Sequence, residues 1–396
     1  MRAGNKKKRI LSVLVFCILL MTGGAAKTVH AEELSLYARS ALLMDASNGR
    51  VLYEENGYAV MPMASTTKIM TCILALEWLE NASEEERKRP VTVSGYAARM
   101  PKVHLGMKAG EEYRLEDLLY SLMLESHNDT AVAIAEHIDG SVEAFAERMN
   151  KKAKELGCEH TNFITPNGLD AEKKGKAHST TAYDLGLIAS YAIRNEKFLE
   201  IISTRNYSFA EKTTGRVFQV LNKNRFLDLM DGAVGIKTGF TGDAGYCFVG
   251  ALKRDGKKLI SVVLGSGWPP NKNWKWKDTR MLMEYGLSKF QGKDLEKKLV
   301  YDPLPVVNGV EPEVEVCVEE KKEGELFLLL SEEDETAVTK EMREEIKAPV
   351  HKGEVVGYEC YYVNGRLYKK YEIKTAESVG LRTYFYCLRQ IFMLYF

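Results

Sequence analysis

The sequence lacks a strong charge of either sign and any spaced cluster of metal-ligating side chains. Its 55 Lys and Arg residues equal its 55 Asp and Glu residues in number. Because nucleic-acid-binding domains are usually strongly basic, nucleic acid is not an expected partner. The seven cysteines and seven histidines fall at wide and irregular spacings, so we expect no metal, no cofactor and no Ser-His-Asp triad.

A hydrophobic run long enough to cross a membrane is also missing. The apolar stretch Ile10 to Met21 is shorter than the ~20 residues of a spanning helix. Basic residues precede it, and Val29-His30-Ala31 offers a small-residue cleavage site, so we expect a secretory signal peptide over residues 1–31. Its removal takes away six basic and no acidic residues and leaves 49 against 55, a net charge of −6.

Three short strings stand in a fixed order along the chain. They are Ser65-Thr66-Thr67-Lys68, Ser126-His127-Asn128 and Lys237-Thr238-Gly239. Each string is weak evidence alone, but the ordered set supplies a nucleophile, proton carriers and a strand that can grip a carboxylate. The set therefore indicates acyl transfer through a serine ester.

The first string predicts an activated serine. Thr66 to Leu79 is apolar almost all round, which predicts a buried helix with Ser65 at its N-terminus and Lys68 on the same face. Burial and the charge of Lys237 would lower the pKa of Lys68, so that it could take the proton of Ser65. The alternative is a helix-capping serine beside a solvated lysine.

The second string falls between a predicted helix, Leu115 to Leu124, and another that begins near Asp129. In such a turn Ser126 can relay a proton, while Asn128 can fix Lys68 and donate to a substrate carbonyl. We expect His127 to be exposed and not to act as a base. An ordinary helix N-cap is the alternative.

The third string lies in a predicted antiparallel sheet, with a hairpin turn at 254–257. An extended peptide can add to such a strand, with Gly239 leaving room for its backbone and Lys237 and Thr238 holding its terminal carboxylate. The backbone N–H groups of Ser65 and Phe240 are candidate oxyanion donors. A surface strand with a solvated lysine is the alternative.

Residues from about Leu36 to Gln291 resemble the catalytic domain of low-molecular-mass penicillin-binding proteins, the serine-type D-alanyl-D-alanine carboxypeptidases. Strings at 167–170, 178–182 and 222–224 agree with this resemblance. It implies that peptidoglycan stem peptide acylates Ser65 with Lys68 as base, that terminal D-alanine leaves, that water hydrolyses the ester, and that β-lactam antibiotics are covalent inhibitors. Many relatives carry an auxiliary arginine after the third string, where this chain offers Lys275 or Arg280.

The order of elements predicts an α/β fold of the penicillin-binding/β-lactamase type. A hairpin over Leu42 to Leu52 and strands after Val217 should share one antiparallel sheet, flanked by helices and a helical lobe. We expect four segments: the signal peptide, a catalytic domain over 32–292, a small all-β domain over 293–376, and an amphipathic helix over 377–396. The β-domain could serve as a spacer or a protein-binding surface.

The last residues, Leu381 to Phe396, place arginines on one side and apolar side chains on the other at helical spacing. This pattern predicts a helix that lies on the membrane surface, with a packed C-terminal helix as the alternative. We also expect Cys72 and Cys247 to be buried and Glu84 to Arg89 to form a solvated loop, and Cys317 could pair with Cys360.

Two other functions are kept as alternatives. A β-lactamase of the same fold is disfavoured because no clear Glu-x-x-Leu-Asn string lies between the second and third motifs. A catalytically silent cell-wall-binding protein is disfavoured because Ser65, Lys68, Asn128 and Lys237 are all present. A transpeptidase side activity stays open, since water and an amine compete for the same ester.

Overall fold

The computed structural model describes residues 34–395, so the predicted signal peptide lies outside the described residues. The main sheet is five-stranded and antiparallel. Its strands are β1 (Ser40–Asp45), β2 (Val51–Glu55), β11 (Ala233–Thr241), β12 (Gly245–Arg254) and β13 (Lys257–Leu264). They lie in the order β11-β12-β13-β1-β2, and β1 pairs with β13 from Ser40↔Leu264 to Asp45↔Leu259. The prediction that early and late strands share one antiparallel sheet is confirmed, and β11 is an edge strand.

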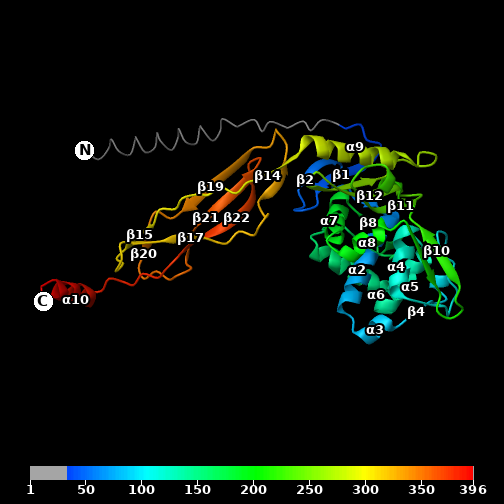
Figure 1. Ribbon diagram of the computed structural model, residues 1–396, viewed down its shortest axis with the longest axis horizontal. Coiled ribbons are helices and arrows are strands. Elements are labelled where there is room, and N and C mark those ends of the chain that lie inside the picture. Colours follow the sequence, from blue (N-terminus) through cyan, green and yellow to red (C-terminus); the bar gives the residue numbers. More distant parts are fainter. Residues whose placement is uncertain (1–33, 396) are drawn as a thin grey trace. The chain divides into compact units, whose positions relative to one another are not determined.

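Strand β1 is buried on both faces of this sheet. A Cβ on Gly186 of α7 (Ala182–Ala192) would lie 2.8 Å from Leu42 Cδ2. One on Gly286 of α9 (Trp274–Lys289) would lie 2.8 Å from Leu43 Cδ2. Neighbouring side chains of a strand point to opposite faces, so the sheet lies between α7 and α9, as Figure 1 shows. A central strand covered on both faces reads as a continuous apolar run.

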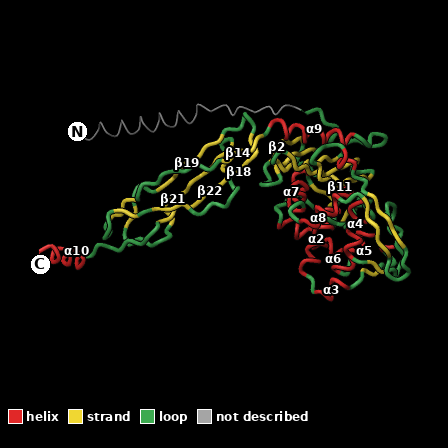
Figure 2. Tube along the Cα trace, viewed as in Figure 1, coloured by secondary structure: helices red, strands yellow, loops and turns green. Residues whose placement is uncertain are grey.

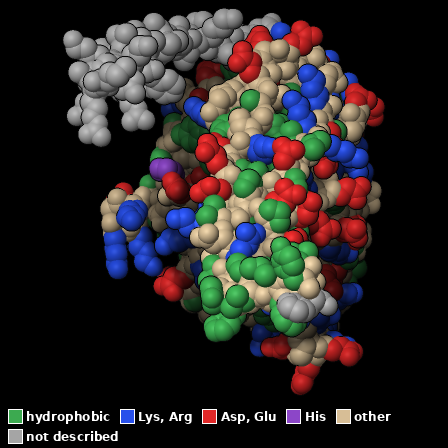
Figure 3. All heavy atoms as spheres, turned by 90° about the vertical axis from the view of Figure 1, so that its left-hand side faces the viewer, with side chains coloured by type: hydrophobic (Ala, Val, Ile, Leu, Met, Phe, Trp, Pro, Cys, Tyr) green, Lys and Arg blue, Asp and Glu red, His purple; other side chains and the backbone are tan. Residues whose placement is uncertain are grey.

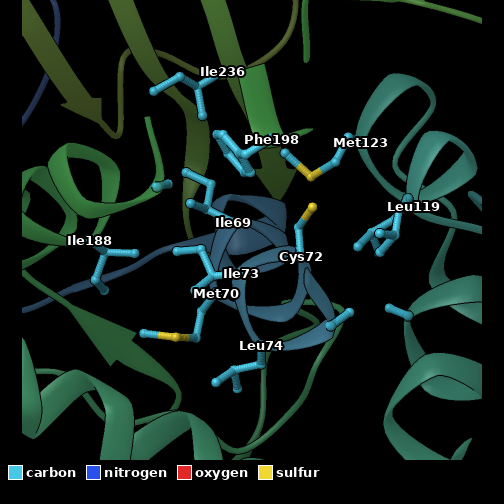
Figure 4. Close-up of a cluster of buried hydrophobic side chains, with 14 of the residues drawn as sticks. Ile69, Met70, Cys72, Ile73, Leu74, Leu119, Met123, Ile188, Phe198 and Ile236 are labelled. Carbon is cyan, nitrogen blue, oxygen red and sulfur yellow. The ribbon is translucent and has the colours of Figure 1, made fainter. Parts of the chain in front are cut away.

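Helix α2 (Lys68–Asn81) runs through the centre of the helical lobe, after a 3₁₀ turn η1 (Ala64–Thr67). Figure 4 shows its side chains Ile69 and Ile73 among apolar side chains of other helices, such as Leu119 and Phe198, and of β11, such as Ile236. Burying one such side chain stabilises the fold by roughly 1.5–3 kcal/mol. The other helices of the lobe are α3 (Glu84–Lys88), α4 (Leu115–Leu124), α5 (Asn128–Asp139), α6 (Val142–Glu155) and α8 (Glu196–Ser203).

The expectation of a loop over Glu84 to Arg89 is wrong, because Glu84–Lys88 is helical. Ser83 Oγ accepts a hydrogen bond from Glu86 N, and the Glu86 carboxylate accepts one from Ser83 N. These two reciprocal hydrogen bonds satisfy the backbone N–H groups of Ser83 and Glu86 at the helix start. They therefore stabilise even a short exposed helix.

Short strands connect the larger elements of this region. Two of them, β9 (Asn206–Ala210) and β10 (Val217–Leu221), form a separate hairpin with Tyr207 and Val220 opposite each other. Two further 3₁₀ turns are η2 (Ala97–Arg99) and η3 (Arg225–Asp228). The strands are β3 (Met61–Pro62), β4 (Val91–Thr92), β5 (Glu112–Tyr113), β6 (Glu172–Lys173), β7 (Lys176–Ala177), β8 (Ser179–Thr180), β9 (Asn206–Ala210) and β10 (Val217–Leu221).

Residues 291–375 are almost entirely strands and loops, as Figure 2 shows. Two apolar clusters form their core, one around Leu304 and Ile373 and one around Leu328 and Tyr361. Gly292 and Lys293 both lie in β14, so this strand spans the expected domain boundary. The strands are β14 (Gln291–Asp294), β15 (Leu304–Val307), β16 (Glu313–Val314), β17 (Val316–Val318), β18 (Phe327–Leu330), β19 (Thr336–Met342), β20 (Ile346–Lys347), β21 (Val355–Val363) and β22 (Arg366–Thr375).

The last helix, α10 (Tyr384–Tyr395), begins three residues after the expected start at Leu381. Its apolar side chains are exposed, from Phe385 to Leu394, and hydrophobic side chains gather on the face that Figure 3 shows. Within residues 34–395, no helix has both the length and the apolar character needed to cross a membrane.

The cysteines of the described residues are all free thiols. Cys72 and Cys247 are buried, as predicted. Cys317 on β17 is exposed, whereas Cys360 on β21 is buried, and the two do not form a disulfide.

Candidate active site

Ser65 and Lys68 lie together at the point where η1 passes into α2. Lys68 Nζ is 3.0 Å from Ser65 Oγ, and Lys68 is fully buried although it begins a helix. Two further acceptors surround the amine: Asn128 Oδ1 at 2.9 Å and the main-chain oxygen of Asn167 at 2.6 Å. These carbonyl oxygens can take both N–H groups of a neutral amine, which leaves its lone pair for the proton of Ser65.

The electrostatics of Lys68 favour the neutral amine. Burial lowers the pKa of Lys68 well below its usual value, and the charge of Lys237 lowers this pKa further. Lys237 is itself buried on β11, and burial lowers the pKa of Lys237 to about 7. Because these two buried lysines lie close to one another, protonation of both at once is unfavourable. A lysine that acts as a base needs such an environment.

The loop around Asn167 is a part of the site to which the sequence assigned no role. Gly168 has φ +82°, and a Cβ at this position would lie 1.9 Å from the main-chain oxygen of Ala64. No other residue fits there, so Gly168 lets the loop approach the turn that carries Ser65. Thr241 Oγ1 also donates to Asp170 Oδ1 at 3.0 Å, which ties the loop to the end of β11.

Thr67 and His178 hold the same turn from inside. Ile164 N donates to His178 Nδ1 at 2.9 Å, so His178 Nε2 carries the proton that faces Thr67 Oγ1 at 2.8 Å. Thr67 Oγ1 in turn donates to the Ala64 main-chain oxygen at 2.8 Å. Burial and the nearby Lys68 lower the pKa of His178 to about 4, so the imidazole is neutral at physiological pH. The string at 178–182 agrees with the family resemblance, but no sequence pattern pointed to this positioning role of His178.

The turn between α4 and α5 brings Ser126 and Asn128 to the site and turns His127 away. Asn128 also donates from Nδ2 to the Pro101 main-chain oxygen at 3.2 Å. Ser126 has φ +69°, and its Oγ is buried without a hydrogen-bond partner among the described residues.

The expectation that His127 is exposed is wrong. Its side chain is buried, with Nδ1 2.8 Å from Ser121 Oγ and Nε2 3.3 Å from a carboxylate oxygen of Glu125. The alternation between neighbouring residues does turn His127 away from Lys68, but the side away from the cleft is filled by α4. Sequence spacing predicts the direction in which a side chain points, but it does not predict which other element of the fold covers that side chain.

On the opposite wall, β11 presents its Lys237-Thr238-Gly239-Phe240 segment. Lys237 Nζ donates to the Thr238 main-chain oxygen at 3.0 Å, and Phe240 is 43% exposed. A Cβ on Gly239 would lie 3.0 Å from Ser65 N, so the absence of a side chain lets β11 lie against the nucleophile turn. This close approach brings the backbone of Ser65 and that of Phe240 to the same place, as an oxyanion hole requires.

A cleft of about 410 Å³ opens between these elements, and Ser65, Ser126 and Thr238 line it. Of the two candidates for an auxiliary cation, Lys275 lines this cleft and Arg280 does not. Burial lowers the pKa of Lys275 to about 8, and its Nζ lies 4.5 Å from the ring centre of Tyr246. The remaining lining residues are Val103, Glu125, Lys223, Arg225, Gly239, Phe240, Tyr246, Lys272, Asn273 and Trp276.

Comparison with known proteins gives the family. A family model described as D-alanyl-D-alanine carboxypeptidase matches residues 25–267. The chain belongs to the D-alanyl-D-alanine carboxypeptidase family. It is 33% identical over 358 residues to the D-alanyl-D-alanine carboxypeptidase DacF of Bacillus subtilis, with 88% of this chain and 89% of DacF covered. DacC of Escherichia coli is 29% identical, with 93% and 90% covered.

Solved structures of similar proteins agree with the family. Penicillin-binding protein 5 of Haemophilus influenzae superimposes with a TM-score of 0.70 at 25% identity, and the match covers 88% of this chain and 99% of that one. Penicillin-binding protein D2 of Listeria monocytogenes, solved in its ampicillin-bound form, gives a TM-score of 0.56 at 34% identity and covers 65% and 100%.

The D-alanyl-D-alanine carboxypeptidase family explains the fold and the activity together. The chain is a serine-type carboxypeptidase of the penicillin-binding type, and the predicted fold class is confirmed. Family membership favours the carboxypeptidase over a β-lactamase or a silent wall-binding protein.

Proposed function

We propose that Ser65 is the nucleophile of this carboxypeptidase and that Lys68 is its base. Ser65 Oγ attacks the carbonyl carbon of the penultimate D-alanine while its proton passes to Lys68 Nζ. The observation that carries the proposal is the 3.0 Å contact of these two atoms, with both other partners of the amine being carbonyl oxygens. The N–H groups of Ser65 and Phe240 stabilise the oxyanion, each by roughly 3–4 kcal/mol.

The leaving group takes its proton through Ser126. The buried Ser126 Oγ lines the cleft beside Ser65 and has no partner of its own among the described residues. A hydroxyl can accept and donate at once, so it can carry a proton from Lys68 to the departing amine of D-alanine. Water then hydrolyses the Ser65 ester, and Asn128 holds Lys68 in place throughout.

Recognition of the substrate rests on its terminal carboxylate. Stem peptide of peptidoglycan adds along the edge strand β11, with Thr238 and Gly239 next to its backbone. Lys237 and Thr238 hold the carboxylate, and Lys275 serves as the auxiliary cation in place of an arginine. The lysine ammonium is a compact point charge, whereas an arginine guanidinium is planar and can donate two parallel hydrogen bonds. The interaction of Lys275 with the carboxylate is therefore less directional than that of an arginine.

Penicillin labelling and D-alanine release test these roles. A fluorescent penicillin should label the protein covalently, and a pentapeptide ending in D-Ala-D-Ala should release free D-alanine. Ser65→Ala should abolish both, whereas Ser94→Ala should keep both, since Ser94 lies outside the cleft. Labelling that persists in Ser65→Ala would assign the nucleophile to another residue.

We further propose that the enzyme acts outside the cytoplasmic membrane and that α10 lies on the membrane surface. The support is the exposed apolar set of α10, from Phe385 to Tyr395, together with the predicted signal peptide. Each apolar side chain that enters the lipid interface contributes about 25 cal/mol per Å².

A truncation tests the membrane proposal. The mature enzyme should sediment with membranes, and a form that ends at Thr383, just before α10, should be soluble and should keep its activity on a small peptide. A mature full-length protein that stays in the soluble fraction contradicts the anchor. Loss of peptide hydrolysis on truncation would show that the tail belongs to the catalytic fold.

A further inference from the structure

We infer that Tyr246 is a positioning residue, whose ring holds the ammonium group of Lys275 toward the terminal carboxylate of the substrate. This inference rests on the proposed function, because it concerns the carboxylate site of the same cleft. Tyr246 belongs to β12, and it lines the active cleft together with Lys275 and Trp276.

The ammonium group of Lys275 has no carboxylate partner within residues 34–395. Its one hydrogen bond goes to the main-chain oxygen of Lys272, at 2.7 Å. Among the described residues that line the cleft, Glu125 alone carries a carboxylate, and it lies 2.9 Å from Lys223 Nζ. An ammonium group has three N–H donors, so Lys275 keeps two of them for a ligand. The carboxylate of the substrate supplies the missing anion.

Two aromatic rings border this ammonium group. Lys275 Nζ lies 4.5 Å from the ring centre of Tyr246 and 4.8 Å from that of Trp276. Lys275 is only 7% exposed, and a cation is attracted to a ring face more strongly where water is excluded. Lys272 and Trp276 are neighbours of Lys275 in the chain, whereas Tyr246 comes from the main sheet. The ring of Tyr246 therefore fixes the ammonium group relative to the strands that bind the substrate.

Tyr246 is itself held in place by its surroundings. Its N–H donates to the Gly267 main-chain oxygen at 2.9 Å, and its own main-chain oxygen accepts from Ser266 N at 2.8 Å. It pairs directly with Phe240 of β11, and the two ring centres are 4.6 Å apart. Directly paired residues of neighbouring strands have side chains on one face, and Thr238 shares that face because it lies two residues from Phe240. The ring thus stands on the face that Thr238 presents to the carboxylate.

The contacts of Tyr246 with Lys275 and with Phe240 are both made by the ring and do not use the hydroxyl. A phenylalanine can therefore replace this tyrosine, but an aliphatic residue of similar size cannot. Because the ring acts through the charge of Lys275, its loss should affect a substrate with a terminal carboxylate and spare the corresponding amide.

Two matched peptides test the inference. Both contain acylated lysyl-D-alanyl-D-alanine, one with a free carboxylate and one with a terminal amide. Wild type should have the higher kcat/KM for the carboxylate, and Tyr246→Leu should lower the carboxylate-to-amide ratio by about ten-fold, the scale of a partly desolvated cation–π contact. Tyr246→Phe should keep the ratio. Tyr58→Leu, at an exposed tyrosine outside the cleft, is the matched control and should also keep it.

Two further variants locate the effect. Lys275→Gln should lower the ratio at least as much as Tyr246→Leu, and the double variant should lower it no further than Lys275→Gln, because the ring acts through the lysine. Pentafluorophenylalanine in place of Tyr246 keeps the shape of the ring and removes its attraction for a cation, so it should lower the ratio as leucine does. This replacement tests the inference even if Tyr246→Leu fails to fold.

Three results would overturn the inference. They are a wild-type ratio in either folded variant at Tyr246, an equal loss on both peptides, and a double variant with a lower ratio than Lys275→Gln. An equal loss on both peptides would assign Tyr246 a general structural role. A wild-type enzyme that does not distinguish the two peptides would instead contradict the carboxylate recognition of the proposed function itself.

Discussion

Two lysines with little solvent exposure, Lys68 in the candidate active site and Lys321 in the β-rich region, have pKa values shifted in opposite directions. Lys68 meets only neutral oxygens, and burial together with Lys237 lowers its pKa. Lys321 lies 2.7 Å from a Glu359 oxygen and donates to the Tyr361 hydroxyl at 2.9 Å. Burial alone would lower the pKa of Lys321, but these bonds and the charge of Glu359 raise it.

The difference shows what separates a reactive lysine from a structural one. A carboxylate partner keeps Lys321 protonated and satisfies both charges, so the pair can stabilise its surroundings but cannot take a proton. Neutral partners and a second cation leave Lys68 available as a base at a cost in folding free energy. Each of the following predictions tests one side of this comparison.

The largest effect should come from Lys68. Lys68→Ala removes the proton acceptor of Ser65, so the rate of penicillin acylation should fall by about 10²–10⁴-fold. Stopped-flow or gel-based labelling measures this rate. Lys88→Ala, at an exposed helix position, is the control and should react like wild type. A loss of less than ten-fold for Lys68→Ala would show that another group takes the proton.

Lys321→Met should instead lower stability and spare catalysis. Glu359 is 1% exposed, and the variant leaves its carboxylate buried without a counter-charge, at a cost of about 3 kcal/mol. Urea unfolding of the full chain measures the loss, and Lys322→Met is a matched exposed control. Unchanged stability would mean that Tyr301 and Tyr361 satisfy the carboxylate without the lysine. A parallel loss of acylation would contradict the separation between the two regions.

Lys237→Met should raise stability while it weakens substrate recognition. The pKa of Lys237 is about 7 in the folded state and that of an unfolded lysine is near 10.4, so the unfolded state binds more protons between these values. Stability therefore rises with pH across this window, and the buried lysine is most unfavourable below it. At pH 6 the variant should gain about 2 kcal/mol and lose this pH dependence. Lower stability in the variant would show that the Thr238 hydrogen bond outweighs burial.

The smallest effect is a shift in the pH profile of acylation. As pH falls, Lys68 becomes protonated and can no longer accept the serine proton, so acylation declines on the acidic side. Lys237→Gln removes a neighbouring cation, which raises the pKa of Lys68 and moves this decline to higher pH. The measurement is the acylation rate against pH for both proteins. A decline that stays in place, or moves to lower pH, would show that Lys237 does not act on Lys68.

The sequence predicted the elements that local patterns encode. The buried helix after Ser65, the turn at Ser126, the hairpins of the main sheet and most strands beyond residue 300 are at their expected places. Strand β19 was missed because its residues are mostly exposed and show no regular alternation of polar and apolar side chains. Its place is set by pairing with β21, which is a tertiary contact and leaves little trace in composition.

The candidate site, like the fold, was predictable from the sequence only in part. The residue types of Ser65, Lys68, Asn128 and Lys237 were readable because acyl transfer needs those groups at those spacings. Which groups surround them was not readable. Three features depend on contacts between segments that are far apart in sequence: the main-chain oxygen of Asn167 on Lys68, the burial of His127, and the place of Lys275 but not Arg280 in the cleft.

The sequence by itself thus determined the order of elements, the candidate reactive side chains and the class of reaction, because hydrophobic periodicity and motif spacing act over a few residues. Only the tertiary structure decided that the pKa of Lys68 is lowered, since a pKa depends on burial and on charges that the fold brings together. It alone also revealed the cleft that Ser65, Ser126 and Thr238 line, because a cleft is formed by side chains of separate elements and has no sequence of its own.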